Sequence, residues 1–421
     1  MNEIREIKGI WFLPDTPDIE TAGILKYDPG QRITLELIGD LKKRTQFDEY
    51  FDNIGPFPVI HGITSEGTKI SVFECYGSWT VKTYSVPLTQ YSISAFVEGK
   101  HMNNQQEALF NSIEVNLAQL LHWLGKNAFE MKRTKVSNTY YHTSIEYNPD
   151  HQFDATYNIE PDFELAFNVT AISKTNFENC KIHNVATVTI SYNGNALPIW
   201  DLVSRMNIFR TFLSLGLLQS IPYNYIKLNE KDGDQQVTYT YLERGEKYNL
   251  KNEPFLYNFG RVEAKMGDML KSWYDSTEDM FPIRVHLLNA ILPKPTFHST
   301  DFMIIAFALE GFYRRFLKSN NERTGNLISA IENILIIFKD LSFIGKVKVT
   351  PVAVNDSRNY YAHLYRKDPA KQILTGVELL KLSERLKVLL VLSILKHMGL
   401  DDSEIEHCVA HSDLLTKVNS F

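Results

Sequence analysis

The feature that most constrains the fold of this 421-residue chain is a change in the spacing of its apolar residues near residue 256. Before that point apolar and polar residues alternate over short stretches, for example in residues 163–169 and 186–192. Because the side chains of a strand point alternately to its two faces, this spacing predicts half-buried β-strands. After that point apolar residues recur every three or four positions, as in residues 302–316, which predicts amphipathic helices. We therefore expect a multidomain α+β protein, with a β-rich region at residues 1–255 and an all-α region at residues 256–421.

The β-rich region is expected to form a sheet or a sandwich of two sheet layers with a few helices. A chain of this length can bury two or three separate cores. A strand followed by a short helix is predicted between residues 104 and 124, and a longer helix between residues 199 and 218. Five aromatic residues are interpreted as sheet core rather than as a platform for stacked bases: Trp11, Phe12, Phe73, Tyr76 and Trp79.

The all-α region is expected to form an antiparallel helical bundle. Helices are predicted at about residues 259–273, 282–292, 327–338 and 376–397. Ser299 or Thr300 is expected to cap the N-terminus of a further helix, and Asp401 or Ser403 that of the last helix. Gly399 is expected to end the long helix.

Residues 388–392, Val-Leu-Leu-Val-Leu, are apolar on every side of their predicted helix. A helix with this composition must be surrounded by protein. Two interpretations are open, since the run can form the core of the bundle or the interface of a dimer.

A further helix carries Arg358, followed directly by Asn359 and then, after three residues, by His363. Arginine carries a permanent charge and a planar fork of donors that suits a phosphate. Histidine takes up and releases protons near neutral pH. Together they come close to the minimum for cleaving RNA, in which a base removes the proton of a ribose 2′-OH and a cation stabilises the attacked phosphate.

The spacing of this pair indicates that one copy is not enough. Five residues along an ideal helix correspond to a position about 140° away, so Arg358 and His363 do not share a face. Two copies that face each other across a dimer would make a better site than one. The alternative interpretation is an arginine and a histidine on the solvated edge of a helix.

The charge around the pair is opposite to that of the whole chain, whose formal net charge is −6. Between residues 341 and 371 six lysines and arginines face two aspartates, which gives a net charge of +4. A basic patch suits a phosphate substrate, and the alternative is a solvated, lysine-rich loop.

Other chemistry finds little support in the sequence. The histidines and the three cysteines lack the spacing of a metal site, and the motifs of ATP-binding loops and serine hydrolases are missing. We therefore expect no metal and no cofactor. Three of the first six residues are charged, and the apolar run after residue 387 is too short to cross a bilayer, so we expect a cytoplasmic protein without membrane contact.

The pattern Arg-Asn-x-x-x-His at residues 358–363, late in an all-helical region, resembles the motif of the HEPN superfamily. The front of the chain resembles the β-rich N-terminal domain of ApeA-type anti-phage HEPN proteins. This second resemblance rests on residues 9–14 (GIWFLP), 23–25 (GIL), 33–39 (ITLELIG), 61–64 (HGIT) and 120–124 (LLHWL). Together the two resemblances cover nearly the whole chain.

The resemblance implies a metal-independent endoribonuclease that acts in abortive-infection defence against phage as a homodimer formed through its HEPN domain. In this interpretation His363 is general base and acid, Arg358 binds the scissile phosphate and Asn359 assists. The family also suggests support from an acidic residue on a neighbouring helix, for which Glu310 is the candidate. The alternative for Glu310 is a surface ion pair with Arg314 on its own helix.

Further roles stay open at the level of sequence. The β-rich region would sense a phage-derived trigger or restrain the nuclease, because an unrestrained nuclease would kill its host. Tyr361 and Tyr365 either stack on a nucleotide or pack within the bundle. The alternative function is a non-catalytic HEPN dimer that binds RNA or a partner.

Overall fold

The structure is a computed structural model of the whole chain. It describes residues 4–29, 31–42, 56–80, 88–106, 108–136, 141–147, 153–175, 178, 180–230, 236–242, 254–275, 277–291, 297–318 and 326–419. The chain divides into two compact units. The first comprises Met1–Leu121, Lys126–Asn207 and Pro222–Asn249, and the second His122–Gly125, Ile208–Ile221 and Leu250–Phe421. The division at residue 255 that the sequence suggests stays a prediction.

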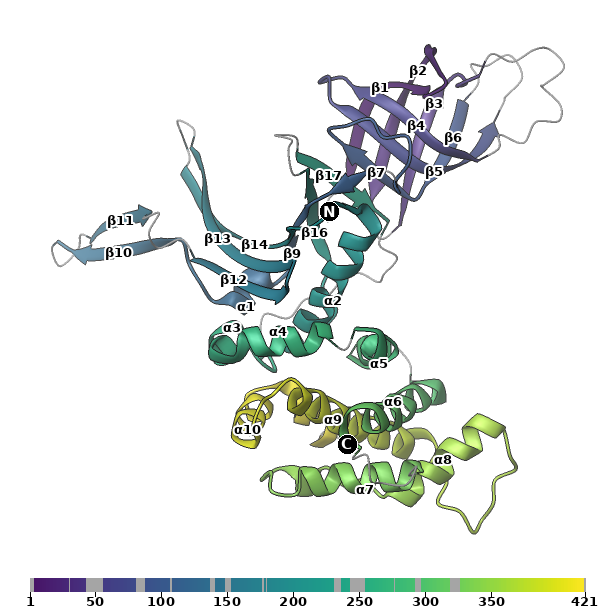
Figure 1. Cartoon of the computed structure of the whole chain (residues 1–421), viewed down its shortest axis with the longest axis vertical. Coiled ribbons are helices and arrows are strands. Elements are labelled where there is room, and N and C mark those ends of the chain that lie inside the picture. The colour runs from purple at the N-terminus through teal and green to yellow at the C-terminus, as the bar shows by residue number, and fades with distance from the viewer. Residues whose placement is uncertain are drawn as a thin grey trace. The chain divides into compact units, whose positions relative to one another are not determined.

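The first six strands close into a β-barrel (Figure 1). They are β1 (Arg5–Leu13), β2 (Thr16–Asp28), β3 (Arg32–Ile38), β4 (Phe57–Thr64), β5 (Lys69–Thr80) and β6 (Leu88–Ile93). All neighbours are antiparallel in the order β1-β2-β3-β6-β5-β4, and β4 pairs with β1 to complete the circle. Closure leaves no free sheet edge, and alternate side chains fill the interior.

The barrel interior is packed with apolar residues, among them Trp11, Leu25, Leu35 and Tyr91, which are nearly or fully buried. Trp11 lies directly opposite Gly62 in the ladder between β1 and β4. A Cβ atom at Gly62 would lie 2.5 Å from the Trp11 ring, so glycine is the residue that fits beneath the indole.

Strand β5 connects the barrel to an open antiparallel sheet. Its residues 70–73 pair with β7 (Ala95–Glu98), and residues 76–80 pair with β6. Glu74 lies between the two stretches with a positive φ of 54°. The sheet continues in the order β7-β17-β16-β9-β14-β13-β12. Its other members are β9 (Ser112–Leu117), β12 (Phe153–Glu160), β13 (Phe163–Thr175), β14 (Cys180–Tyr192), β16 (Tyr223–Asn229) and β17 (Gln236–Tyr241).

Several shorter elements complete this part of the chain. The strands β8 (Leu109–Phe110) and β15 (Leu197–Pro198) pair with each other, as do β10 (Phe129–Lys135) and β11 (Tyr141–Tyr147). The predicted strand and short helix are confirmed as β9 and α1 (Leu120–Leu124), and the longer helix as α2 (Ile199–Leu217). The β-rich class is therefore confirmed, and its arrangement is a barrel joined to a sheet rather than two stacked layers.

The core prediction for the aromatic residues is wrong at one position. Trp11, Phe12 and Phe73 are buried as expected, but Tyr76 is exposed. Cys75 points into the barrel interior, so the alternation of the strand turns the next side chain outward. The side chain of Trp79 lies outside the described residues.

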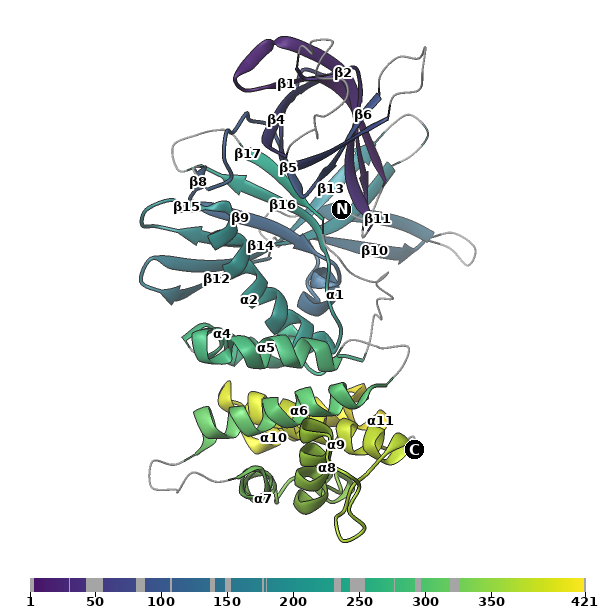
Figure 2. The same ribbon diagram turned by 90° about the vertical axis from the view of Figure 1, so that its right-hand side faces the viewer.

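The rest of the chain is helical, as predicted. The helices are α3 (Phe259–Val262), α4 (Met266–Asp275), α5 (Thr277–Ile291), α6 (Ser299–Phe312), α7 (Leu327–Ile337), α8 (Pro351–His363), α9 (Gly376–His397), α10 (Asp402–Ala410) and α11 (Thr416–Asn419). Helix α6 packs against α5, α8 and α9, and α7 packs against α8 (Figure 2). A π-helical turn, Tyr313–Leu317, extends α6.

The N-cap predicted for α10 is confirmed, and the N-cap predicted for α6 is not. Asp401 caps α10 by accepting a hydrogen bond from the Glu404 N–H at 2.9 Å. Gly399, at φ +90°, follows the end of α9. The expected cap at Ser299 or Thr300 is wrong. His298 occupies the N-cap position of α6, and its N–H donates to the Asp301 carboxylate at 3.0 Å.

The apolar run at residues 388–392 is the core of the bundle. All five side chains have no exposed surface in a single chain. A side chain without exposed surface cannot contact a second copy, so the dimer-interface interpretation is wrong for this run.

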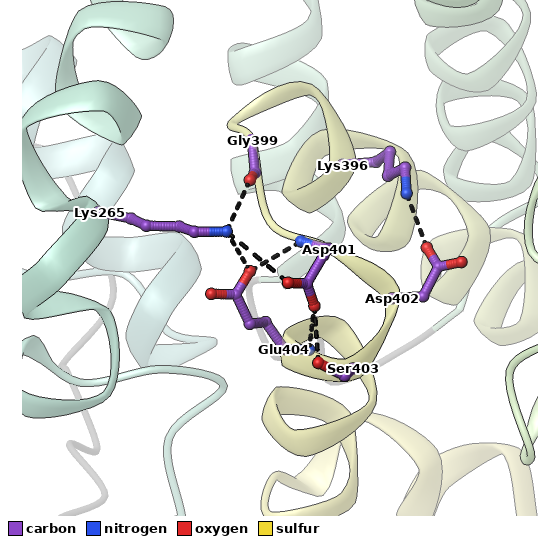
Figure 3. A network of polar contacts seen from close by, with 7 residues as sticks. All are labelled: Lys265, Lys396, Gly399, Asp401, Asp402, Ser403 and Glu404. Carbon is purple, nitrogen blue, oxygen red and sulfur yellow. Dashed lines mark hydrogen bonds and ion pairs between the residues drawn. The ribbon is translucent and has the colours of Figure 1, made fainter.

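A polar network holds α10 to the segment that precedes α4 (Figure 3). The Lys265 Nζ atom donates to the Glu404 carboxylate at 2.6 Å and to the Gly399 carbonyl at 3.2 Å. It also lies 3.9 Å from the Asp401 carboxylate. Nearby, the Ser272 hydroxyl donates to the His397 carbonyl at 3.0 Å. Residues 265–272 are thereby joined to the end of α9 and the start of α10.

We expect Leu390→Ala to lower the free energy of unfolding by about 2–5 kcal/mol, because the substitution leaves a cavity in the core. On the same helix Val377 is 58% exposed, and Val377→Ala should change the stability by less than about 0.5 kcal/mol. Denaturant titration followed by circular dichroism measures both. An unchanged midpoint for Leu390→Ala, with a smaller oligomer, would instead place this run in an interface.

His397 should make the protein less stable in mild acid. Its ring packs against Phe312 and Phe316, and its Nε2 atom is buried without a partner among the described residues. Burial lowers the pKa of His397, so the unfolded chain takes up a proton before the folded chain does. Stability is therefore lost as the pH falls below the unfolded pKa of about 6.5.

The measurement compares the free energy of unfolding at about pH 7.5 and about pH 5.5, on either side of an ordinary histidine pKa. His397→Phe, which keeps an aromatic ring, should show a smaller difference than the original chain. The difference should not vanish, because burial also lowers the pKa of His61 and His286. An identical difference in both proteins would contradict the assignment.

Candidate active site

The site is organised by α8, whose start and end follow from its sequence. Pro351 stands at the first turn, where its fixed φ suits a helix and its missing N–H costs nothing. Leu364 follows with a left-handed conformation at φ 53° and ends the helix. Ala353, Val354 and Ser357 are buried on the face toward α6 and α7.

The Arg358 guanidinium points toward α6. Its Nη2 atom lies 3.7 Å from the Glu310 carboxylate, and its side chain is 20% exposed. The Nε atom of Arg358 is buried and has no hydrogen-bond partner in the described part of the chain. The guanidinium is therefore close to a carboxylate without being bound to it by a hydrogen bond.

Glu310 lies between two arginines. Its side chain is 12% exposed, and its other carboxylate oxygen forms a short ion pair with Arg314, at 2.6 Å. The two interpretations of Glu310 from the sequence are thus compatible, since one oxygen faces the arginine of its own helix and the other faces Arg358. A buried carboxylate is stabilised by such paired cations.

His363 is the last residue of α8, and its side chain is exposed. Its ring stacks on Tyr365, with 5.1 Å between the ring centroids and 28° between the planes. Among the described residues, no hydrogen bond and no ring contact joins Arg358 to His363. This separation agrees with their spacing on a helix.

The other two sequence candidates lie between these ends. Asn359 is half-buried next to Arg358. The Tyr361 hydroxyl donates to the Leu374 carbonyl at 3.4 Å, and its ring meets that of Tyr360 edge-on at 4.9 Å. Burial and the neighbouring Tyr360 raise the pKa of Tyr361. These contacts favour packing over nucleotide stacking for Tyr361.

Two residues that shape the site have no signal in the sequence. Asp356 accepts a hydrogen bond from the Gln372 N–H at 3.0 Å, and Ser357 accepts one from the Leu374 N–H at 2.9 Å. Both contacts hold the chain after α8 against the helix. The partners are 16 and 17 residues apart, so no local pattern signals them.

Basic residues surround α8 and reach the solvent. Lys346, Lys348, Arg366, Lys367 and Lys371 are exposed, and none forms an ion pair within the described ranges. In the same ranges no three histidine, cysteine, aspartate or glutamate side chains gather closely enough to hold a metal ion. None of the helices described is long and apolar enough to cross a membrane.

A β-barrel joined to an open sheet, followed by a helical bundle with an Arg-Asn-x-x-x-His helix, defines a two-part protein with a C-terminal HEPN domain. Residues 6–273 match the family model described as ApeA N-terminal domain 1, and residues 303–404 match the one described as Apea-like HEPN. The chain belongs to the ApeA family, as the resemblance predicts. Neither the search of curated proteins nor that of solved structures found a match.

Membership of this family indicates the general class of function. The ApeA-like HEPN domain is the one expected of an anti-phage HEPN protein. HEPN domains are generally associated with nucleases, and they commonly dimerise and bind RNA.

Glu310→Gln should lower the free energy of unfolding by about 1–3 kcal/mol, because the nearly buried Arg358 loses a charged neighbour. Arg314→Gln removes a partner that is half exposed, and should cost about 0–1 kcal/mol. A double-mutant cycle between Glu310 and Arg358 isolates the coupling of that pair. A coupling of zero would show that their 3.7 Å approach contributes nothing.

Proposed function

We propose that this protein is a metal-independent endoribonuclease that acts in abortive-infection defence against phage. The observation that carries the proposal is the arrangement of side chains on α8, in a domain that matches the Apea-like HEPN family. This helix holds Arg358 beside the Glu310 carboxylate and presents His363 to solvent. Asn359 follows Arg358 on the same helix.

The proposed reaction needs no group beyond these side chains. The imidazole of His363 removes the proton of a ribose 2′-OH, whose oxygen attacks the adjacent phosphorus. The bond from phosphorus to the 5′ oxygen of the next nucleotide breaks, and that oxygen receives a proton from an imidazolium. The products are a 2′,3′-cyclic phosphate and a 5′-hydroxyl end.

Arg358 supplies the charge that this reaction requires. Its guanidinium binds the scissile phosphate and stabilises the negative charge that grows on it. The closer arginine of Glu310 is Arg314, at 2.6 Å against 3.7 Å for Arg358. This geometry leaves Arg358 donors for a phosphate, while Glu310 limits where the side chain can turn. Asn359 would hydrogen-bond the phosphate or orient His363.

The proposed active form is a homodimer. In one chain Arg358 faces α6 and His363 lies at the solvent end of α8, so a single copy presents the two groups apart. Two copies that face each other through this surface would bring an arginine of one to a histidine of the other. The exposed basic residues around α8 would attract the RNA backbone to the same surface.

The β-rich region is proposed to sense infection or to restrain the nuclease, with a phage-derived molecule as the trigger and the cytoplasm as the place of action. The Lys265–Glu404 contact lies within the helical part of the chain, and it joins the end of the segment matched by the N-terminal family to the segment matched by the HEPN family.

A second function is favoured by the separation of Arg358 and His363. A non-catalytic dimer that binds RNA or a partner protein would use the same basic surface without requiring the two groups to converge. This function predicts binding without turnover.

The nuclease proposal predicts that the full chain cleaves RNA in the presence of EDTA. His363→Ala should lower the rate by about 100-fold to 10,000-fold, the usual contribution of a general acid–base residue. Arg358→Lys should also lose most activity, because the ammonium group keeps the charge and lacks the planar fork. Gel analysis of a labelled RNA measures both.

His411→Ala is the matched control, since His411 is an exposed histidine just after α10, outside the motif. It should cleave at the original rate. Full activity in both motif variants would overturn the proposal, and binding of RNA without cleavage by the original chain would favour the second function.

A further inference from the structure

We infer that residues 364–375, which we call the motif loop, form a subsite for single-stranded RNA in which Tyr365 stacks on a base beside the scissile phosphate. The inference rests on the proposed function and deepens it. It assigns a role in holding the RNA to residues outside the Arg-Asn-x-x-x-His motif.

Leu364 ends α8 with a left-handed backbone conformation, and the Tyr365 ring that follows stacks on His363. Tyr365 is nevertheless 58% exposed, so much of its ring surface remains open. A base that stacks there lies next to the imidazole that would take the 2′-OH proton.

The two tyrosines near His363 differ in their surroundings. Tyr361 is half-buried, and its hydroxyl is engaged with the Leu374 carbonyl. Tyr365 is 58% exposed, and its ring stacks on that of His363. Tyr365 is therefore the ring that can receive a base.

Hydrogen bonds hold the motif loop in place. Its far end is tied to α8 through Asp356 and the buried Ser357. Within the loop the Asp368 carboxylate accepts a hydrogen bond from the Ala370 N–H at 2.9 Å. These bonds order the loop before any ligand arrives, which lowers the entropic cost of binding.

The motif loop carries a net positive charge. Arg366, Lys367 and Lys371 are exposed and form no ion pair within the described ranges, and Asp368 is the one acidic residue among positions 364–375. Cations beside an exposed aromatic ring are the usual means of holding single-stranded nucleic acid. The bases of duplex RNA are stacked on one another and cannot reach such a ring.

The test measures binding of a single-stranded RNA oligonucleotide with 2′-O-methyl riboses, which cannot be cleaved by attack of the 2′ oxygen. Tyr365→Ala should raise the Kd by about 5-fold to 150-fold, which corresponds to the loss of one stacked base. Tyr365→Phe keeps the ring and should bind like the original chain. The same sequence as a duplex should bind more weakly and be insensitive to Tyr365→Ala.

The charge is tested with the triple variant Arg366→Ala, Lys367→Ala, Lys371→Ala. Each phosphate contact contributes about 0.7 to the slope of log Kd against log salt for a single strand, so the slope should fall by about 2. Lys271→Ala, which removes an exposed lysine from α4, is the control and should leave the slope unchanged.

An unchanged Kd for Tyr365→Ala would overturn the subsite. Slower cleavage by that variant with the same Kd would show that Tyr365 only orients His363. Binding of the blocked oligonucleotide does not require turnover. Binding that depends on Tyr365 in a chain that cleaves nothing would thus refute the nuclease and leave the subsite standing.

Discussion

The packing of α9 against α6 is the constraint on which the helical part of this protein depends. Helix α9 carries five consecutive apolar residues without exposed surface, and such a run is stable only when other helices surround it. Helix α6 is one of those helices, and it also carries Glu310. The core of the bundle therefore determines where the carboxylate beside Arg358 lies.

Helix α8 places its two motif residues in different environments. Near its middle Arg358 is mostly buried beside Glu310, where the protein limits its motion. At its end His363 is exposed, and its ring stacks on that of Tyr365. A phosphate-binding group benefits from being held in place, and a proton-transfer group must reach its substrate. The helix provides each residue with the environment that its proposed role requires.

The β-rich part depends on a different constraint, the pairing of β5 with two neighbours. One half of β5 closes the barrel with β6, and the other half continues into the open sheet through β7. Alternating residues predict strands here, but alternation says nothing about which strands pair. Closure of β1 onto β4, and the side on which Tyr76 emerges, are set by contacts between residues far apart in the chain.

The sequence by itself determined the order of the β-rich and helical parts, the family, and the bounds of α9, because periodicity and motifs are local properties that any single segment displays. It also singled out Arg358, Asn359, His363 and Glu310 as candidates. Only the tertiary structure placed Glu310 between two arginines, assigned residues 388–392 to the core, and tied the motif loop to α8. Those outcomes depend on which surfaces meet when helices pack, and residues that are distant in sequence become neighbours only in the folded chain.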